Sequence, residues 1–141
     1  MILLDTNHLS VLWFAQDQQN SNLANRLAAS ADKQVATTVI TMEEVLRGWL
    51  AEIKRLREFD KQILIYERLA SVVERFSQWE VVGFGRSAVT MLEALLNQRV
   101  RIGIMDLKIA SIALAHRALL LTANLKHFRR VPSLRVENWL D

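Results

Sequence analysis

The chain has 141 residues, 51% hydrophobic and 23% charged, with four glycines and one proline. This composition excludes a disordered, collagenous or low-complexity protein, and the length suits one domain spanning residues 1–141. The absence of cysteine excludes a disulfide framework and a thiolate metal site. No apolar run is long enough for a membrane span, so we expect an unprocessed cytoplasmic protein with no membrane partner. The net charge of +3 only weakly favours a polyanionic ligand.

The first half of the chain alternates strands and helices. The apolar run Ile2–Leu4 has no polar alternation and predicts a strand covered on both faces. Two short helices are expected next, over His8–Ala15 and Ser21–Ala31. The β-branched run Val35–Ile40 predicts a second strand, and Thr41 is a good cap for a helix that begins at the next residue.

The second half of the chain continues this alternation. Apolar residues such as Trp49 and Tyr66 recur at helical spacing up to about Phe76, and a break near Glu58–Asp60 makes this a helical hairpin. The remaining predicted elements are strands at Trp79–Val82, Leu119–Thr122 and Arg135–Glu137 (an edge strand), and helices at Arg86–Gln98 and Ile104–Ala118. Such alternation predicts an α/β fold of three layers, α/β/α, around a mainly parallel sheet of about four or five strands.

Four polar residues are predicted to meet at the carboxyl edge of this sheet, where open α/β sheets bind their ligands. Asp5 and Asn124 follow strands, while Glu44 and Asp106 open crossover helices. Each also has a purely structural explanation. Asp5 and Asn124 are common cap or turn residues, Asp106 suits a helix dipole, and Glu44 completes a capping box with Thr41.

Together the three acids indicate a metal site, because carboxylates that share a site repel one another unless a cation neutralises them. Oxygen ligands without cysteine or a His-Glu-x-x-His pair favour Mg²⁺ or Mn²⁺ over Zn²⁺. The histidines, His8, His116 and His127, are scattered along the chain, so we expect no histidine metal site.

Four segments carry a resemblance to a known family: ILLDTN at 2–7, VITMEEVLRG at 39–48, GIMDLKIASIALAH at 103–116 and LLTANLKHFRRVPSLRVENW at 120–139. They resemble the PIN-domain ribonucleases, specifically the VapC toxins of bacterial toxin–antitoxin pairs. The resemblance implies a PIN-like fold and a Mg²⁺-dependent endoribonuclease, with Mn²⁺ as an alternative ion. It also implies an RNA substrate such as tRNA or another structured RNA, a VapB-like antitoxin and a homodimer.

The resemblance also implies roles for individual residues. The three family acids match Asp5, Glu44 and Asp106, and Glu44 is preferred to Glu43 because a glycine follows it by four residues. The catalytic residues are then Asp5, Glu44, Asp106 and Asn124, of which the three acids bind the metal, and Thr6 and Thr122 support the site. The chain departs from the family at His127, where many relatives carry an acid before the phenylalanine.

Cations near these residues in sequence are candidates for RNA binding, namely Lys108, Lys126, Arg129 and Arg130. The alternative is that they are ordinary solvated surface charges. The four tryptophans have two possible roles, stacking on RNA bases or packing in the core, and core packing is preferred.

Two other functions compete with a nuclease. A catalytically weak RNA-binding or regulatory module of the same fold is supported by His127. A phosphatase or phospho-receiver with Asp5 as nucleophile is disfavoured, because Asp5-Thr6-Asn7 lacks the second acid of an Asp-x-Asp pattern. A P-loop nucleotide enzyme is excluded, because the four glycines form no phosphate-binding loop.

Overall fold

A computed structural model describes residues 1–141 and contains one sheet of five parallel strands. The strand order is β3-β2-β1-β4-β5, so the first strand of the chain lies in the centre. The strands are β1 (Ile2–Leu4), β2 (Val35–Thr38), β3 (Val81–Val82), β4 (Leu119–Leu121) and β5 (Arg135–Glu137). The predicted parallel sheet is confirmed, including β5 as an edge strand.

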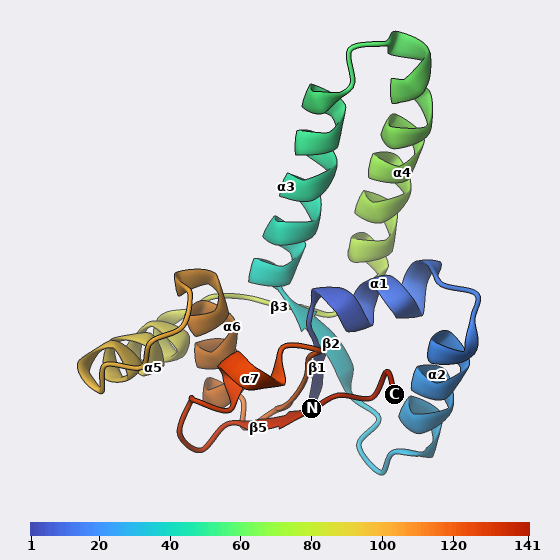
Figure 1. The fold of residues 1–141 in the computed structure, drawn as a ribbon. Coiled ribbons are helices and arrows are strands. Elements are labelled where there is room, and N and C mark those ends of the chain that lie inside the picture. The colour runs from blue at the N-terminus through green and yellow to red at the C-terminus, as the bar shows by residue number, and fades with distance from the viewer.

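Helices cover both faces of the sheet, which confirms the α/β fold. They are α1 (Thr6–Phe14), α2 (Gln18–Ala29), α3 (Val39–Arg55), α4 (Phe59–Gln78), α5 (Arg86–Asn97), α6 (Ile104–Ala115) and α7 (Leu125–Phe128). In Figure 1, α1 and α2 lie on one side of the sheet and α5 and α6 on the other, while the α3–α4 hairpin projects away from it. The short helix α7 was not predicted.

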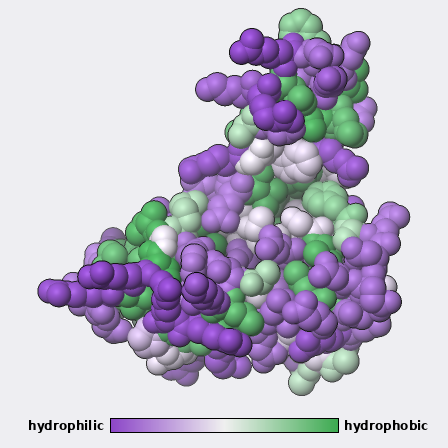
Figure 2. Space-filling view, in the orientation of Figure 1, coloured by the Kyte–Doolittle hydropathy of each residue, from purple (hydrophilic) through white to green (hydrophobic).

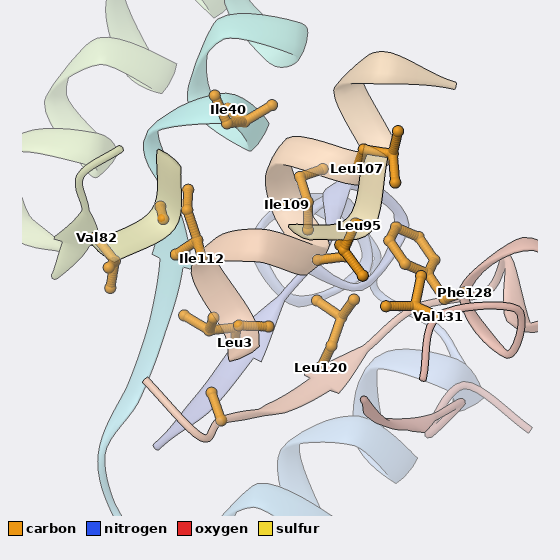
Figure 3. Packing of buried hydrophobic residues seen from close by; sticks show 14 of the residues in the cluster. Leu3, Ile40, Val82, Leu95, Leu107, Ile109, Ile112, Leu120, Phe128 and Val131 are labelled. Atoms are coloured by element: carbon orange, nitrogen blue, oxygen red, sulfur yellow. The ribbon is translucent and has the colours of Figure 1, made fainter. Parts of the chain in front are cut away.

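The two faces of the sheet are buried in two separate clusters of apolar residues. Along β1, Leu3 packs into one cluster while Ile2 and Leu4 pack into the other, as the pleat of a strand requires. Helix α6 lies inside the first cluster, where Ile109 and Ile112 are fully buried (Figure 3). This double burial explains why the sequence of β1 shows no polar alternation.

Helix α3 begins three residues earlier than predicted. The hydroxyl of Thr38, the last residue of β2, accepts a hydrogen bond of 3.0 Å from the backbone N–H of Thr41. Thr38 is therefore the N-cap, and the predicted capping box between Thr41 and Glu44 is wrong. The β-branched residues Val39 and Ile40 belong to the first turn of the helix and not to the strand.

The predicted hairpin of α3 and α4 is confirmed, but much of its apolar surface faces outward. Gln62 joins the two helices, since its side-chain amide donates to the carbonyls of Ile53 and Leu56 at 3.2 and 2.7 Å. The exposed large apolar side chains of the hairpin are Leu50, Phe59, Ile63, Leu64, Tyr66 and Val73. Figure 2 shows hydrophobic residues gathered along this projection beside hydrophilic ones. Neither these helices nor any other is both long and apolar enough to cross a membrane.

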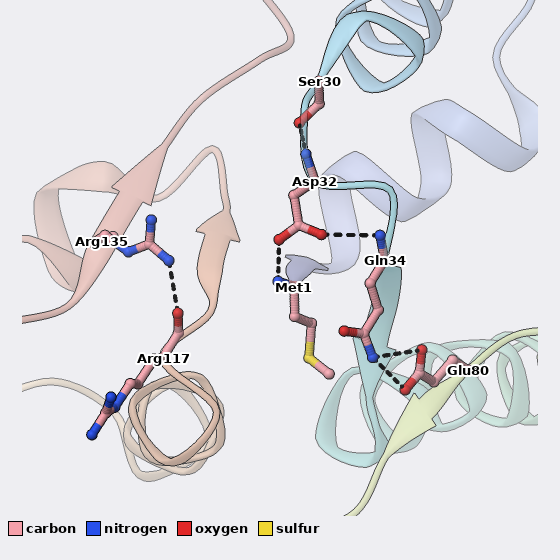
Figure 4. A network of polar contacts seen from close by, with 7 residues as sticks. All are labelled: Met1, Ser30, Asp32, Gln34, Glu80, Arg117 and Arg135. Atoms are coloured by element: carbon pink, nitrogen blue, oxygen red, sulfur yellow. Dashed lines mark hydrogen bonds and ion pairs between the residues drawn. The ribbon is translucent and has the colours of Figure 1, made fainter.

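Polar contacts at the amino edge of the sheet hold loops together. Asp32 accepts a hydrogen bond of 3.0 Å from the backbone N–H of Gln34, whose side chain donates to Glu80 at 3.1 Å (Figure 4). Across the edge, Arg135 donates to the carbonyl of Arg117 at 2.7 Å. These contacts join the residues that precede β2 and β3, and they join β5 to the turn after α6.

Candidate functional site

Asp5 lies at the carboxyl edge of the sheet, directly after the central strand β1. One of its carboxylate oxygens, Oδ1, accepts the backbone N–H of Thr6 at 2.8 Å and so caps α1. The other, Oδ2, accepts the hydroxyl of Thr122 at 3.0 Å. Leu4 pairs with Leu121 across β1 and β4, so the strand register brings the next residues of both strands together. Capping therefore uses only one of the two Asp5 oxygens.

Glu44 joins this site through Thr6, whose hydroxyl donates to Glu44 Oε2 at 2.9 Å. Thr38, and not Thr41, caps α3, so the Glu44 side chain has no capping role at the start of this helix. The adjacent Glu43 instead forms an exposed ion pair with Arg47. The structure thus places Glu44, and not Glu43, beside Asp5.

Asn124 connects the other side of Asp5 to Asp106. Its backbone N–H donates to the Thr122 hydroxyl at 3.0 Å, and its side-chain amide donates to Asp106 Oδ2 at 3.4 Å. The same amide nitrogen lies 2.9 Å from Nδ1 of His127. Asn124 precedes α7 but makes no side-chain cap hydrogen bond, so capping does not explain its orientation. Asp106 does lie in the first turn of α6, where the helix dipole favours it.

The three acids therefore belong to one hydrogen-bonded cluster, which we call the acidic cluster. It runs from Glu44 through Thr6 to Asp5, and from Asp5 through Thr122 and Asn124 to Asp106. Side chains separated by up to 117 positions in the sequence meet here. All six predicted catalytic and supporting residues are brought together.

The charge of the acidic cluster is not balanced by the protein. Burial raises the pKa of Asp5, and repulsion from Asp106 raises it further. Burial likewise raises the pKa of Glu44, with repulsion from Asp5, Asp106 and Glu43 adding to it. No lysine or arginine forms an ion pair with Asp5, Glu44 or Asp106. This is the electrostatic condition in which a cation binds favourably.

The donor chemistry of the cluster fits a divalent metal ion. Carboxylate oxygens of Asp5, Glu44 and Asp106 and the amide oxygen of an asparagine are ligands that Mg²⁺ and Mn²⁺ accept. No three acidic or histidine side chains are grouped closely enough to hold an ion as they lie. Binding a metal here therefore requires these side chains to move toward it.

We expect the raised pKa values to make the metal-free protein less stable as pH rises. A carboxyl group whose pKa is raised by folding keeps its proton to a higher pH in the folded protein than in the unfolded chain. The folded protein therefore loses stability as pH rises through the folded-state pKa of that group. His8 has the opposite effect on stability. Burial lowers its pKa from 6.5 to about 4, so the stability that His8 contributes is lost as pH falls from 6.5 toward 4. Comparison with Asp5→Asn isolates the Asp5 contribution.

The measurement is urea denaturation of both proteins, without divalent ions, between mildly acidic and neutral pH. Asp5→Asn should gain stability relative to the parent as pH rises. Asparagine keeps an oxygen that can cap α1, so loss of the cap does not obscure the comparison. A constant difference across the pH range would show that Asp5 carries no excess charge penalty.

The predicted RNA-binding cations differ in their placement. Lys126 and Arg129 are exposed on and just after α7, close to Asn124 in the chain. Arg130 donates to the carbonyl of Arg101 at 3.0 Å. Lys108 lies 6.0 Å from the ring centre of Phe84, and residues two apart on a helix do not share a face, so Lys108 is not beside Asp106.

The tryptophans mainly pack in the interior, as preferred from the sequence. Trp13 and Trp139 are buried, and Trp13 makes edge contacts with Phe76 and Trp79. Trp49 is half-buried and lines an open groove that begins at Thr6 and Glu44 and continues between α3 and α4. The sequence did not predict this groove, because its walls come from three helices, α1, α3 and α4, and no sequence pattern reports how they pack.

Comparisons with known proteins agree with this fold and site. Residues 2–134 match the PIN domain family, to which the chain therefore belongs. It is 30% identical to Ribonuclease VapC2 from Rickettsia felis over 97% of this chain and 96% of that protein. This similarity identifies the chain as a PIN domain of the VapC type.

Solved structures give the same result. VapBC2 from Rickettsia felis, in a crystal structure with a DNA fragment from its promoter, matches with a TM-score of 0.71 and 27% identity, over 99% of both chains. VapBC-1 from nontypeable Haemophilus influenzae matches with a TM-score of 0.72 and 23% identity, over 100% of both chains. The predicted PIN-like architecture is thereby confirmed.

Proposed function

We propose that this protein is a metal-dependent endoribonuclease and the toxin of a VapBC-type toxin–antitoxin pair. The observation that carries the proposal is the acidic cluster, in which three carboxylates from distant segments converge without a balancing protein cation. The similarity to Ribonuclease VapC2 supports RNA as the substrate, and tRNA or another structured RNA is our choice. Its place of action is then the cytoplasm.

Each residue of the acidic cluster has a role in this proposal. Asp5 and Asp106 are the principal ligands of Mg²⁺ or Mn²⁺, and Glu44 holds the attacking water and accepts its proton. Bound there, the ion would make the water more acidic and offset the charge that builds on the phosphate. Asn124 orients the water or phosphate through its amide, while Thr6 and Thr122 hold the carboxylates by their hydroxyls. Lys126, Arg129 and Arg130 bind the RNA backbone, and Lys108 contributes from farther away.

The groove beside Glu44 is the proposed binding site for a VapB-like antitoxin. It is lined by Val45, Trp49 and Ile65 and opens directly onto Thr6 and Glu44, so a peptide lying in it would block access to the acidic cluster. Similar solved structures are those of VapBC proteins. The remaining exposed apolar surface of the hairpin is available for a homodimer contact.

The neighbouring residues Glu43 and Glu44 allow a direct test. We expect Glu44→Gln to lower cleavage of labelled RNA by about 100-fold, because it removes the group placed to accept a proton. Glu43→Gln should stay within about twofold of the parent, since Glu43 only pairs with Arg47 at the surface. EDTA should abolish cleavage, and Mg²⁺ or Mn²⁺ should restore it.

The outcome also separates the nuclease from its alternative. A catalytically weak RNA-binding module would bind the labelled RNA in a gel-shift assay but leave it intact at every metal concentration. Equal effects of the two glutamine substitutions would mean that Glu44 has no special part in the reaction.

A further inference from the structure

His127 occupies a position beside the acidic cluster that the proposed mechanism does not use. His127 lies on α7. The residue after it, Phe128, is fully buried and fixes this turn against the core. Its ring nitrogen Nδ1 lies 3.6 Å from Asp106 Oδ2, and 45% of its side chain is exposed. Of the three histidines, only His127 lies within 4.0 Å of a carboxylate.

Asn124 contacts both His127 and Asp106 through the same amide nitrogen. The Asn124 amide nitrogen donates to Asp106 Oδ2, and the opposite amide orientation would place its oxygen against that carboxylate. The same nitrogen lies 2.9 Å from His127 Nδ1, which accepts this contact in the tautomer that carries its proton on Nε2. The three contacts form a triangle with sides of 2.9, 3.4 and 3.6 Å, so His127 Nδ1 and Asp106 Oδ2 lie side by side next to the Asn124 amide nitrogen.

This spacing is close to that of two ligands on one metal ion. Donor atoms about 2.1 Å from an ion are about 3.0 Å apart in octahedral coordination and about 3.4 Å apart in tetrahedral coordination. The 3.6 Å between Nδ1 and Oδ2 is close to these values, so the two atoms become a ligand pair once the Asn124 amide turns away and the side chains shift slightly. Imidazole nitrogen suits transition metals, whereas Mg²⁺ prefers oxygen.

We propose that His127 Nδ1 and Asp106 together bind the metal ion of the acidic cluster, giving a mixed nitrogen and oxygen site that prefers transition metals such as Mn²⁺ or Co²⁺ to Mg²⁺. This inference rests on the proposed function, because it concerns the ion of the same site. It differs from the sequence prediction, which expected no histidine ligand. His127 then determines which ion the protein uses.

The test is calorimetric titration of the tag-free protein with Co²⁺, Mn²⁺ and Mg²⁺ separately. We expect His127→Gln to weaken Co²⁺ binding about tenfold or more while Mg²⁺ binding stays within about twofold. Glutamine can still accept the Asn124 hydrogen bond, so a purely positional role would be preserved. His127→Glu should raise Mg²⁺ affinity, because it supplies an oxygen. His116→Gln, at the exposed end of α6, is the matched control and should change neither affinity.

Three results separate this inference from the proposed function. If His127→Gln bound Co²⁺ as tightly as the parent, the assignment of His127 as a ligand would be overturned. An equal loss of Co²⁺ and Mg²⁺ affinity would also overturn it, because it would indicate that His127 only positions other groups. If either is found while Asp106→Asn abolishes metal binding and the parent cleaves RNA, the proposed function stands. A parent protein that binds divalent ions but cleaves no RNA would overturn the proposed function. The titrations would then still decide whether His127 is a metal ligand.

Discussion

Asp106→Asn should lower the rate of metal-dependent RNA cleavage by about 10³-fold while the protein stays folded. The substitution removes a charge that repels Asp5 and Glu44 and leaves an oxygen that can accept the Asn124 hydrogen bond. Stability should therefore stay within about 1 kcal/mol of the parent, because the relieved repulsion offsets the lost helix-dipole interaction. A principal metal ligand is nevertheless weakened. The measurement is initial-rate cleavage of labelled RNA beside a urea denaturation curve.

The chain offers a matched control for Asp106. Asp60 is an exposed acid in the first turn of α4, as Asp106 is in the first turn of α6. Asp60→Asn loses the same helix-dipole interaction, about 0.3–1 kcal/mol, but should cleave RNA at the parent rate. A pure Asp106→Asn protein that cuts as fast as Asp60→Asn would show that Asp106 binds no essential ion.

Phe128→Ala should have the largest effect on folding, lowering the free energy of unfolding by about 3–5 kcal/mol. The Phe128 side chain is fully buried among Leu95, Leu107 and Val131 (Figure 3), so its removal leaves a cavity in the first apolar cluster. It also releases α7, which follows Asn124 and carries His127. Cleavage should therefore fall even where the variant remains folded.

Phe59→Ala is the control, because Phe59 is 83% exposed at the start of α4. Its unfolding free energy should lie within about 0.5 kcal/mol of the parent. Equal stability of the two alanine variants, measured by urea denaturation, would mean that Phe128 does not anchor α7.

The core of the site was predictable because it depends on strand ends. The apolar run before Asp5 and the run before Thr122 indicated adjacent buried strands, and their pairing in register places these two residues together. The start of α3 was predicted wrongly because Val39 and Ile40 are β-branched, so they extended the apparent strand and hid the cap at Thr38.

Other features depend on contacts that a sequence pattern does not report. Helix α7 has four residues, too few to show a helical period. His127 was set aside because the histidines are far apart in sequence, although its partner Asp106 is also far away and the fold brings them to 3.6 Å. Tyr66 recurs at helical spacing with other apolar residues of the hairpin, yet its side chain is exposed, because apolar spacing does not say whether a partner element covers that face.

The central claim is that Asp5, Glu44 and Asp106 surround one divalent ion at the carboxyl edge of the sheet, with Asp5 and Asp106 as its principal ligands. Anomalous X-ray scattering from crystals containing Mn²⁺ tests it most directly. We predict a manganese peak within direct coordination distance of the Asp5 and Asp106 carboxylates, absent from Asp5→Asn crystals. A protein that cleaves RNA with Mn²⁺ while its manganese peak lies away from these carboxylates would contradict the account.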